Sequence, residues 1–221
     1  MERIRKRGER GGWALDSSGR VSLGGAERSD AVRNRRRIVS AARALFEERG
    51  VTNVTMEEIS RAAGVGKGTL YRRFANKGLL CQALLDEPTR RFQSEVLVSL
   101  GGPESGPLEK LKGFLRRLVL FTEDNLNLLY GGYDTLQGVE RVAHYDHPAY
   151  GWMRWTVLGL LREAVRREEL EAGLDVEYLA DALLAPLNVD LYYHQRRVMG
   201  ITVERISAGL SSLLPGQTSG K

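Results

Sequence analysis

The stretch from Thr55 to Lys77 decides the fold, and it reads TMEEISRAAGVGKGTLYRRFANK. Thr55 and Glu58 have the spacing of a capping box, in which two residues satisfy each other's backbone N–H groups where a helix begins. Gly64-Val65-Gly66 interrupts that helix, and a second short helix is expected over Lys67–Phe74. Two short helices joined by a tight glycine turn predict a helix-turn-helix, whose second helix lies in the major groove of DNA.

The second helix of this unit has side chains suited to DNA. We expect its first residues, Lys67, Gly68 and Thr69, to point at base edges, since glycine permits close approach and threonine offers a hydroxyl and a methyl group. Tyr71, Arg72 and Arg73 are expected on the outward side. The alternatives are that the arginines are ordinary solvated surface and that Tyr71, like Phe74, is a core aromatic.

The rest of the chain has helical periodicity and no alternating strand pattern, so the predicted class is all-α. Before the motif, apolar residues recur at helical spacing from Ile38 to Phe46, in a helix expected from about Arg33 to Gly50. After it, a helix starting near Gly78 leads into further helical segments. The expected positions of the later helices are about 108–122, 148–170, 176–199 with a kink at Pro186, and 203–213.

Charge divides the 221-residue chain into two parts. The net formal charge is +9 over residues 1–80 and −4 over residues 81–221. A basic N-terminal part on a mildly acidic body indicates either a nucleic-acid-binding module or a basic tail on ordinary surface. We expect three regions: a flexible basic arm at 1–30, a helix-turn-helix domain at 31–80, and a helical effector-binding and dimerisation domain at 81–221.

Cysteine content and hydropathy indicate the compartment. The single cysteine, Cys81, cannot form an internal disulfide and is expected to be a small core residue. No apolar run approaches the roughly 20 residues that a membrane-spanning helix needs. The basic first thirty residues lack the apolar segment of a secretory signal. These features predict a soluble cytoplasmic protein with no membrane contact.

The order of landmarks over residues 33–80 resembles the DNA-binding domain of the tetracycline-repressor (TetR) family. The resemblance rests on Arg37-Ile38, Ala41-Ala42, Leu45-Phe46, Gly50, Val54-Thr55, Ile59, Ala63 through Tyr71, Phe74, Lys77 and Leu79-Leu80. It implies a transcriptional regulator, expected to be a repressor that a small molecule releases from an inverted-repeat operator. Residues beyond about 90 have no comparable motif.

The resemblance also implies roles for individual residues. Thr55 matches a phosphate contact, and Met56 matches a position that sometimes reads a base. Tyr71 matches a phosphate-binding tyrosine and Lys77 a phosphate-binding lysine. The base-reading segment of the family matches Lys67, Gly68 and Thr69. Arg73 stands where the family often has histidine, which favours stronger phosphate binding, and Arg72 is a candidate for reading guanine.

The C-terminal body is expected to hold an apolar pocket between helices. Its candidate ligand-binding residues are Phe114, Phe121, Tyr130, Trp152, Trp155, Asn188 and Tyr192. Trp152 and Trp155 lie three residues apart and so are predicted to share a helix face. These residues favour a small apolar or aromatic effector; the alternative is that they are ordinary core or interface residues. The resemblance implies a homodimer formed by helices 148–170 and 176–199, with Val157, Leu161, Ala164 and Leu183 among the pairing residues.

Other signals do not predict a site. The glycines at 64, 66 and 68 lack the spacing and the preceding strand of a phosphate-binding loop. His144, Asp146 and His147 do not predict a metal site, because Pro148 disfavours helical geometry at His147. We expect no cofactor and no catalytic group. The competing hypothesis is a helical small-molecule carrier or enzyme whose basic N-terminal region is incidental.

Overall fold

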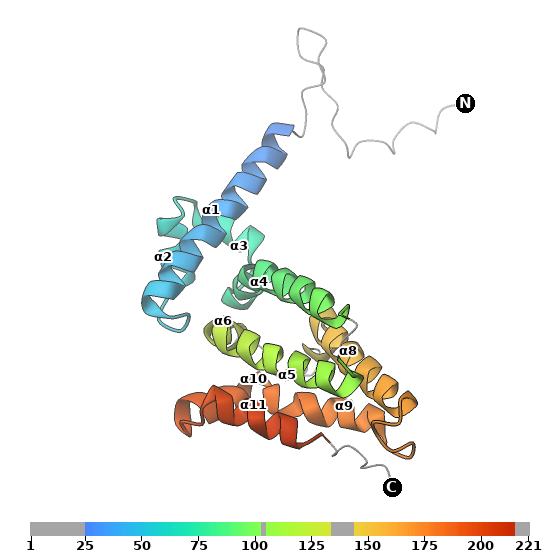
Figure 1. Ribbon diagram of the computed structural model, residues 1–221. Coiled ribbons are helices and arrows are strands. Elements are labelled where there is room, and N and C mark those ends of the chain that lie inside the picture. The colour runs from blue at the N-terminus through green and yellow to red at the C-terminus, as the bar shows by residue number, and fades with distance from the viewer. Residues whose placement is uncertain (1–24, 103–104, 134–143, 215–221) are drawn as a thin grey trace, which may run out of the picture.

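The computed structural model describes residues 25–102, 105–133 and 144–214, and every regular element in these ranges is helical (Figure 1). The α-helices are α1 (Gly25–Arg49), α2 (Met56–Ala62), α3 (Lys67–Arg73), α4 (Lys77–Leu100), α5 (Pro107–Asp124), α6 (Leu126–Tyr133), α8 (Pro148–Arg166), α9 (Val176–Leu184), α10 (Val189–Tyr193) and α11 (Val203–Ser212). Short 3-10 turns occupy His144–Asp146 and Ala185–Leu187, and a π-helical segment occupies His194–Val198. The all-α class predicted from the sequence is confirmed.

The N-terminal domain has its own apolar core. The predicted stripe on α1 faces this core, with Ile38, Ala42 and Phe46 buried against residues of α2, α3 and the first turns of α4. Full burial of such a side chain contributes about 1.5–3 kcal/mol. Helix α1 begins at Gly25, so the last residues of the expected arm, 25–30, are helical. The remaining residues of the expected arm, 1–24, lie outside the described residues.

Helix α4 connects the N-terminal domain to the helical body, which comprises α5–α11. Cys81 and Leu84 lie in the N-terminal core, whereas Phe92 and Val96 lie in the core of the body. A single helix thus crosses the predicted domain boundary at residue 80 and contributes residues to both cores. Cys81 is buried as expected, and this burial raises the pKa of its thiol to about 12.

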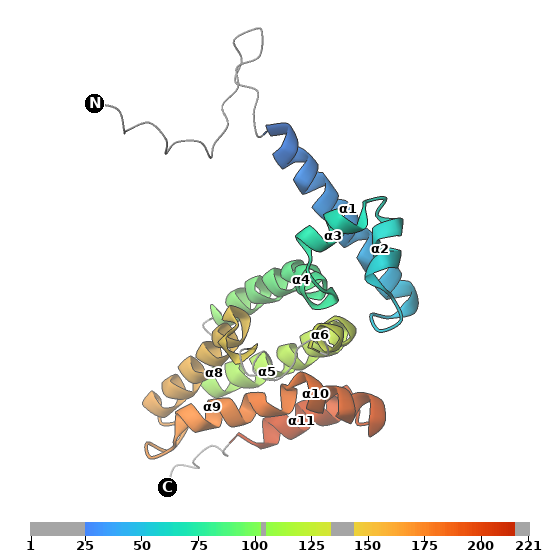
Figure 2. The same cartoon turned by 180° about the vertical axis from the view of Figure 1, so that it is seen from behind.

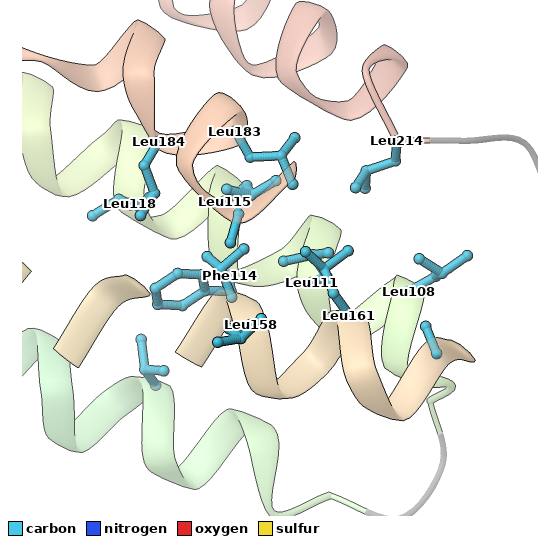
Figure 3. Close-up of a cluster of buried hydrophobic side chains, with 14 of the residues drawn as sticks. Leu108, Leu111, Phe114, Leu115, Leu118, Leu158, Leu161, Leu183, Leu184 and Leu214 are labelled. Atoms are coloured by element: carbon cyan, nitrogen blue, oxygen red, sulfur yellow. The ribbon is translucent and has the colours of Figure 1, made fainter. Parts of the chain in front are cut away.

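The largest core lies between α4, α5, α8 and α9. Leucines from α5, α8 and α9 surround Phe114 in this cluster, and Leu214 closes it from the C-terminal side (Figure 3). A second cluster joins Val119, Leu126 and Tyr192 to two residues of α11, Ile206 and Leu210. The helical body is therefore held by side chains that come from distant parts of the sequence.

The predicted helix at 176–199 is broken. Pro186 lies in the 3-10 turn after α9, because proline lacks the backbone N–H that a continuous α-helix requires. Helix α8 begins at Pro148, with His147 as its N-cap, and ends at Arg166 rather than near 170. The last helix, α11, matches its expected position closely. None of the helices within the described residues is long and apolar enough to span a membrane.

Candidate nucleic-acid interface and effector region

Helices α2 and α3 lie at the end of the molecule remote from α9 and α11, as Figures 1 and 2 both show. The predicted capping box at the start of α2 is present: the Thr55 backbone N–H donates to Glu58 at 2.8 Å, and the Glu58 backbone N–H donates to the Thr55 hydroxyl at 3.2 Å. Arg49 on α1 also donates to Glu58, at 2.9 Å. The Thr55 backbone N–H, the Thr55 hydroxyl and Arg49 lower the pKa of Glu58 to about 2.

The tight glycine turn predicted between α2 and α3 is present. Gly64 has a φ of +58°, in the region where non-glycine residues are strained. Two contacts that the sequence analysis missed hold the turn. Arg37 of α1 donates to the Gly64 carbonyl at 3.1 Å, and the buried Ser60 hydroxyl donates to the Val65 carbonyl at 2.7 Å. Nothing in the local motif marks Arg37 or Ser60, because each acts through a backbone carbonyl that only the folded turn presents.

Helix α3 has an inner and an outer face. Leu70 is buried, as is Phe74, which caps the helix, whereas Tyr71 is 51% exposed. The other residues expected to contact DNA on this helix are exposed or half-buried: Lys67, Gly68, Thr69, Arg72 and Arg73. No atom lies within 4 Å of a Cβ placed at Gly68, so that surface is open to an external molecule.

Two of the residues expected to contact DNA also contact the domain itself. Met56 is half-buried and packs against the N-terminal core. The Lys77 ammonium donates to the carbonyls of Val51 and Val54 at 2.8 and 3.0 Å. In this conformation Lys77 therefore joins the start of α4 to the loop after α1, a structural role that the sequence analysis missed.

Lys67, the first residue of α3, forms an ion pair with Glu57 of α2. Its Nζ lies 2.7 Å from the Glu57 carboxylate, and both side chains are more than half exposed. The hydrogen bond from Lys67 lowers the pKa of Glu57 below its ordinary value. The base-reading segment thus begins with a cation that already has an internal partner.

The structure brings together three of the predicted effector residues. Phe114, Phe121 and Trp152 surround Phe92 of α4, whose ring centroid lies 6.2, 4.7 and 5.9 Å from theirs. Phe92 was not among the residues predicted to bind the effector, although it lies in the region assigned to the effector-binding domain. The sequence signal that could have found it is helical spacing, since Phe92 follows Leu84 by eight residues and Val96 follows Phe92 by four.

The other predicted effector residues lie elsewhere. Trp155 is 64% exposed, whereas Trp152, three residues earlier on α8, is partly buried in the core, so Trp155 lies outside the aromatic cluster that Trp152 joins. Tyr130 stacks on Tyr193 at 3.8 Å. Asn188 donates to the Tyr145 hydroxyl at 2.6 Å.

Tyr192 fills a core rather than joining the aromatic cluster around Phe92. It is fully buried, and its hydroxyl lies 3.2 Å from the Glu123 carboxylate. Arg196 donates to the same carboxylate at 2.7 and 2.9 Å. Arg196 lowers the pKa of Glu123, while burial raises the pKa of Tyr192. This network ties α5 to the π-helical segment and gives Tyr192 a structural role.

Two other features bear on ligands. A surface hollow of about 370 Å³ lies at the turn between α8 and α9, lined by Arg162, Val165, Arg166, Ala172, Leu174 and Val176. None of the predicted effector residues lines it. Within the ranges that the structure describes, no three His, Cys, Asp or Glu side chains gather as metal ligands would.

The dimer prediction needs correction for individual residues. Val157, Leu161, Ala164 and Leu183 were expected to pair with a partner, but they are buried in the chain's own core. The large apolar side chains exposed between 148 and 199 are instead Trp155, Tyr178, Leu191, Val198 and Met199.

Comparison with known proteins agrees with this geometry. Residues 38–84 match the family described as "Bacterial regulatory proteins, tetR family". An HTH-type transcriptional regulator of Staphylococcus aureus (strain bovine RF122 / ET3-1) is 36% identical over 103 residues, which are 47% of this chain and 55% of that protein. Another, from strain USA300, is 50% identical over 54 residues, 24% of this chain and 29% of that protein. The chain thus spans about half or less of the length of these curated relatives.

Solved structures share the fold over most of the chain. Thermus thermophilus FadR, a TetR family transcriptional repressor in complex with lauroyl-CoA, has a TM-score of 0.63 and 22% identity, covering 85% of this chain and 98% of that one. A TetR/AcrR family regulator from Thermobifida fusca has a TM-score of 0.59 and 18% identity, covering 81% and 94%. The described chain combines an N-terminal helix-turn-helix with a helical body, which is the architecture of these regulators of known structure. Residues 38–84 are therefore similar to the tetR family of bacterial regulatory proteins, and the described chain shares the fold of a TetR/AcrR family regulator of known structure.

Proposed function

We propose that this chain is a transcriptional repressor that binds an inverted-repeat operator as a homodimer and is released from it by a small apolar or aromatic effector. One observation carries the proposal. Helix α3 buries Leu70 and exposes Tyr71, Arg72 and Arg73 on a face that no other part of the described chain covers. Guanidinium and phenol groups on an exposed second helix suit phosphates and base edges. The protein would act by binding in the cytoplasm, not by catalysing a reaction.

The aromatic cluster around Phe92 supports a site for the effector. Four aromatic side chains from α4, α5 and α8 meet there, and apolar sites between helices commonly hold small molecules. Lauroyl-CoA in the complex with FadR is an apolar-chain ligand in a protein of the same fold. We propose that the effector of this chain inserts beside Phe92 and Trp152, so both are site candidates together with Phe114 and Phe121.

Helix α6 offers a physical connection between that region and the DNA-binding domain. Leu128 packs against the N-terminal core. A Cβ at Gly131 would lie 2.3 Å from the side chain of Val51, in the loop that Lys77 holds, so the Gly131 backbone packs directly against the Val51 side chain. A shift of α6 would therefore move the loop after α1. A ligand that binds one position of α6 more tightly than another would shift the population toward that position and so change the affinity for DNA. By linkage, DNA would change the affinity for the ligand by the same factor.

Twofold symmetry supports the dimer. A single helix-turn-helix contacts few base pairs, whereas two related by a twofold axis read successive major grooves of an inverted repeat. The exposed apolar side chains Leu191, Val198 and Met199 lie close together in sequence on α10 and the segment after it. We propose that this surface contributes to the dimer contact.

Selection of DNA fragments with the purified chain tests the function. A repressor should enrich one inverted-repeat motif, with an affinity that falls steeply as salt increases. Val198→Glu should lower the dimer fraction measured by sedimentation and weaken operator binding, whereas Arg116→Glu, an exposed charge change on α5, should leave the dimer intact. Enrichment of no motif, together with small-molecule binding, would favour the carrier hypothesis.

A further inference from the structure

The Glu57 carboxylate lies within the surface expected to face DNA. Glu57 is in the first turn of α2, next to Met56, and its Oε1 is 2.7 Å from Nζ of Lys67, the first residue of α3. Their side chains are 56% and 62% exposed. A negative charge on a surface that approaches phosphates opposes binding. Its placement against the cation of the base-reading segment therefore bears on affinity.

We propose that Glu57 competes with DNA for the Lys67 ammonium and thereby lowers the affinity of the chain for DNA. The inference rests on the proposed DNA-binding function. An ammonium held by an internal carboxylate is available to a base edge or a phosphate only in the fraction of molecules in which the pair is open. The apparent affinity falls by that fraction, as for any protein whose binding-competent state is partly populated.

The surroundings of Glu57 favour the ionised carboxylate. The positive end of the α2 macrodipole lies at the first turn of that helix, and Arg61 adds a second positive charge one turn further along. Lys67, in contrast, has no other ion-pair partner among the described residues. The pair is therefore formed in the free protein, and the approach of DNA opens it. Because both side chains are exposed, the expected effect is about two- to fivefold in affinity.

The experiment measures the affinity for the duplex selected by the wild-type chain. Glu57→Gln should bind this duplex about two- to fivefold more tightly than the matched control Glu48→Gln. Glu48 is an exposed residue of α1, so the control makes the same change in net charge in the same domain away from Lys67. In a Lys67→Ala background, Glu57→Gln should have no more effect than Glu48→Gln, because the cation for which Glu57 competes is gone. Increasing salt should shrink the difference between the two single variants, since the pair is exposed.

A measurement without DNA tests the pair itself. The Glu57 carboxyl, followed by NMR titration, should have a lower pKa in the wild-type chain than in Lys67→Ala. An equal pKa in both would overturn the proposal, as would equal DNA affinities of Glu57→Gln and Glu48→Gln. Either result leaves the DNA-binding function standing if the wild-type chain has enriched a motif. Enrichment of no duplex would refute the function and the competition together.

Discussion

The helix-turn-helix and the helical body contrast in how their functional side chains come together. In the helix-turn-helix, the residues expected to contact DNA lie within one short stretch, and the capping box and Gly64 fix their orientation locally. In the body, the aromatic cluster needs Phe92 from α4, Phe114 from α5 and Trp152 from α8. A site built within one motif can be read from spacing, whereas a site built between helices depends on how each helix is rotated in the fold.

The largest expected effect tests the rotation of α8. Trp152→Ala should lower the free energy of unfolding by about 3 kcal/mol, the low end for removal of a buried tryptophan, because Trp152 is partly buried. Trp155→Ala should change it by less than about 0.5 kcal/mol, as expected of an exposed site. Chemical denaturation measures both. An equal loss of stability in Trp155→Ala would show that another surface covers this side chain in the assembled protein. The response to the effector should be lost in Trp152→Ala and kept in Trp155→Ala.

The next effect tests the contact between the two regions. Gly131→Val places atoms where Val51 already lies, so we expect a loss of about 1–3 kcal/mol of stability and altered operator affinity. Gly113→Val on α5 is the matched control, since nothing lies within 4 Å of a Cβ there. Thermal unfolding and operator titration measure the outcome. Adding Val51→Ala should restore part of the loss, and a failure to do so would argue against direct contact.

Base reading by α3 gives an effect of similar or smaller size. Lys67→Ala or Thr69→Ala should relax the preference at one position of each half-site by roughly 1–3 kcal/mol. Tyr71→Phe removes only the exposed hydroxyl and should weaken binding uniformly across sequences. Selection with each variant distinguishes these results. An unchanged motif for both Lys67→Ala and Thr69→Ala would contradict the assignment of the base-reading segment.

The smallest effect concerns the capping box at low pH. The pKa of Glu58 is lowered from 4.5 to about 2 in the folded chain, so its contribution to stability is present above pH 4.5 and is lost as the pH falls toward 2. Glu58→Gln should therefore lower stability at neutral pH, and the difference from wild type should vanish near pH 2. Denaturant titrations across this range measure it. Glu47→Gln, an exposed change on α1, should not reproduce the pattern.

The sequence by itself determined the features that depend on neighbouring residues. The Thr55–Glu58 capping box, the positive φ of Gly64 and the burial of Leu70 and Phe74 follow from spacing of a few residues, because backbone N–H groups and helix periodicity impose these rules locally. The break at Pro186 has the same origin, since proline cannot donate within a helix.

Only the tertiary structure decided the contacts between elements. Lys77 has the sequence context of a phosphate ligand, yet it donates to the Val51 and Val54 carbonyls, which the loop after α1 brings within reach. Trp155 is an aromatic residue of the kind that lines apolar pockets, yet its side chain is exposed. Phe92 enters the aromatic cluster because α4 crosses the domain boundary. Periodicity fixes which residues share a face of a helix. The partner of each face depends on the simultaneous packing of all the helices, which the pattern within one segment does not contain.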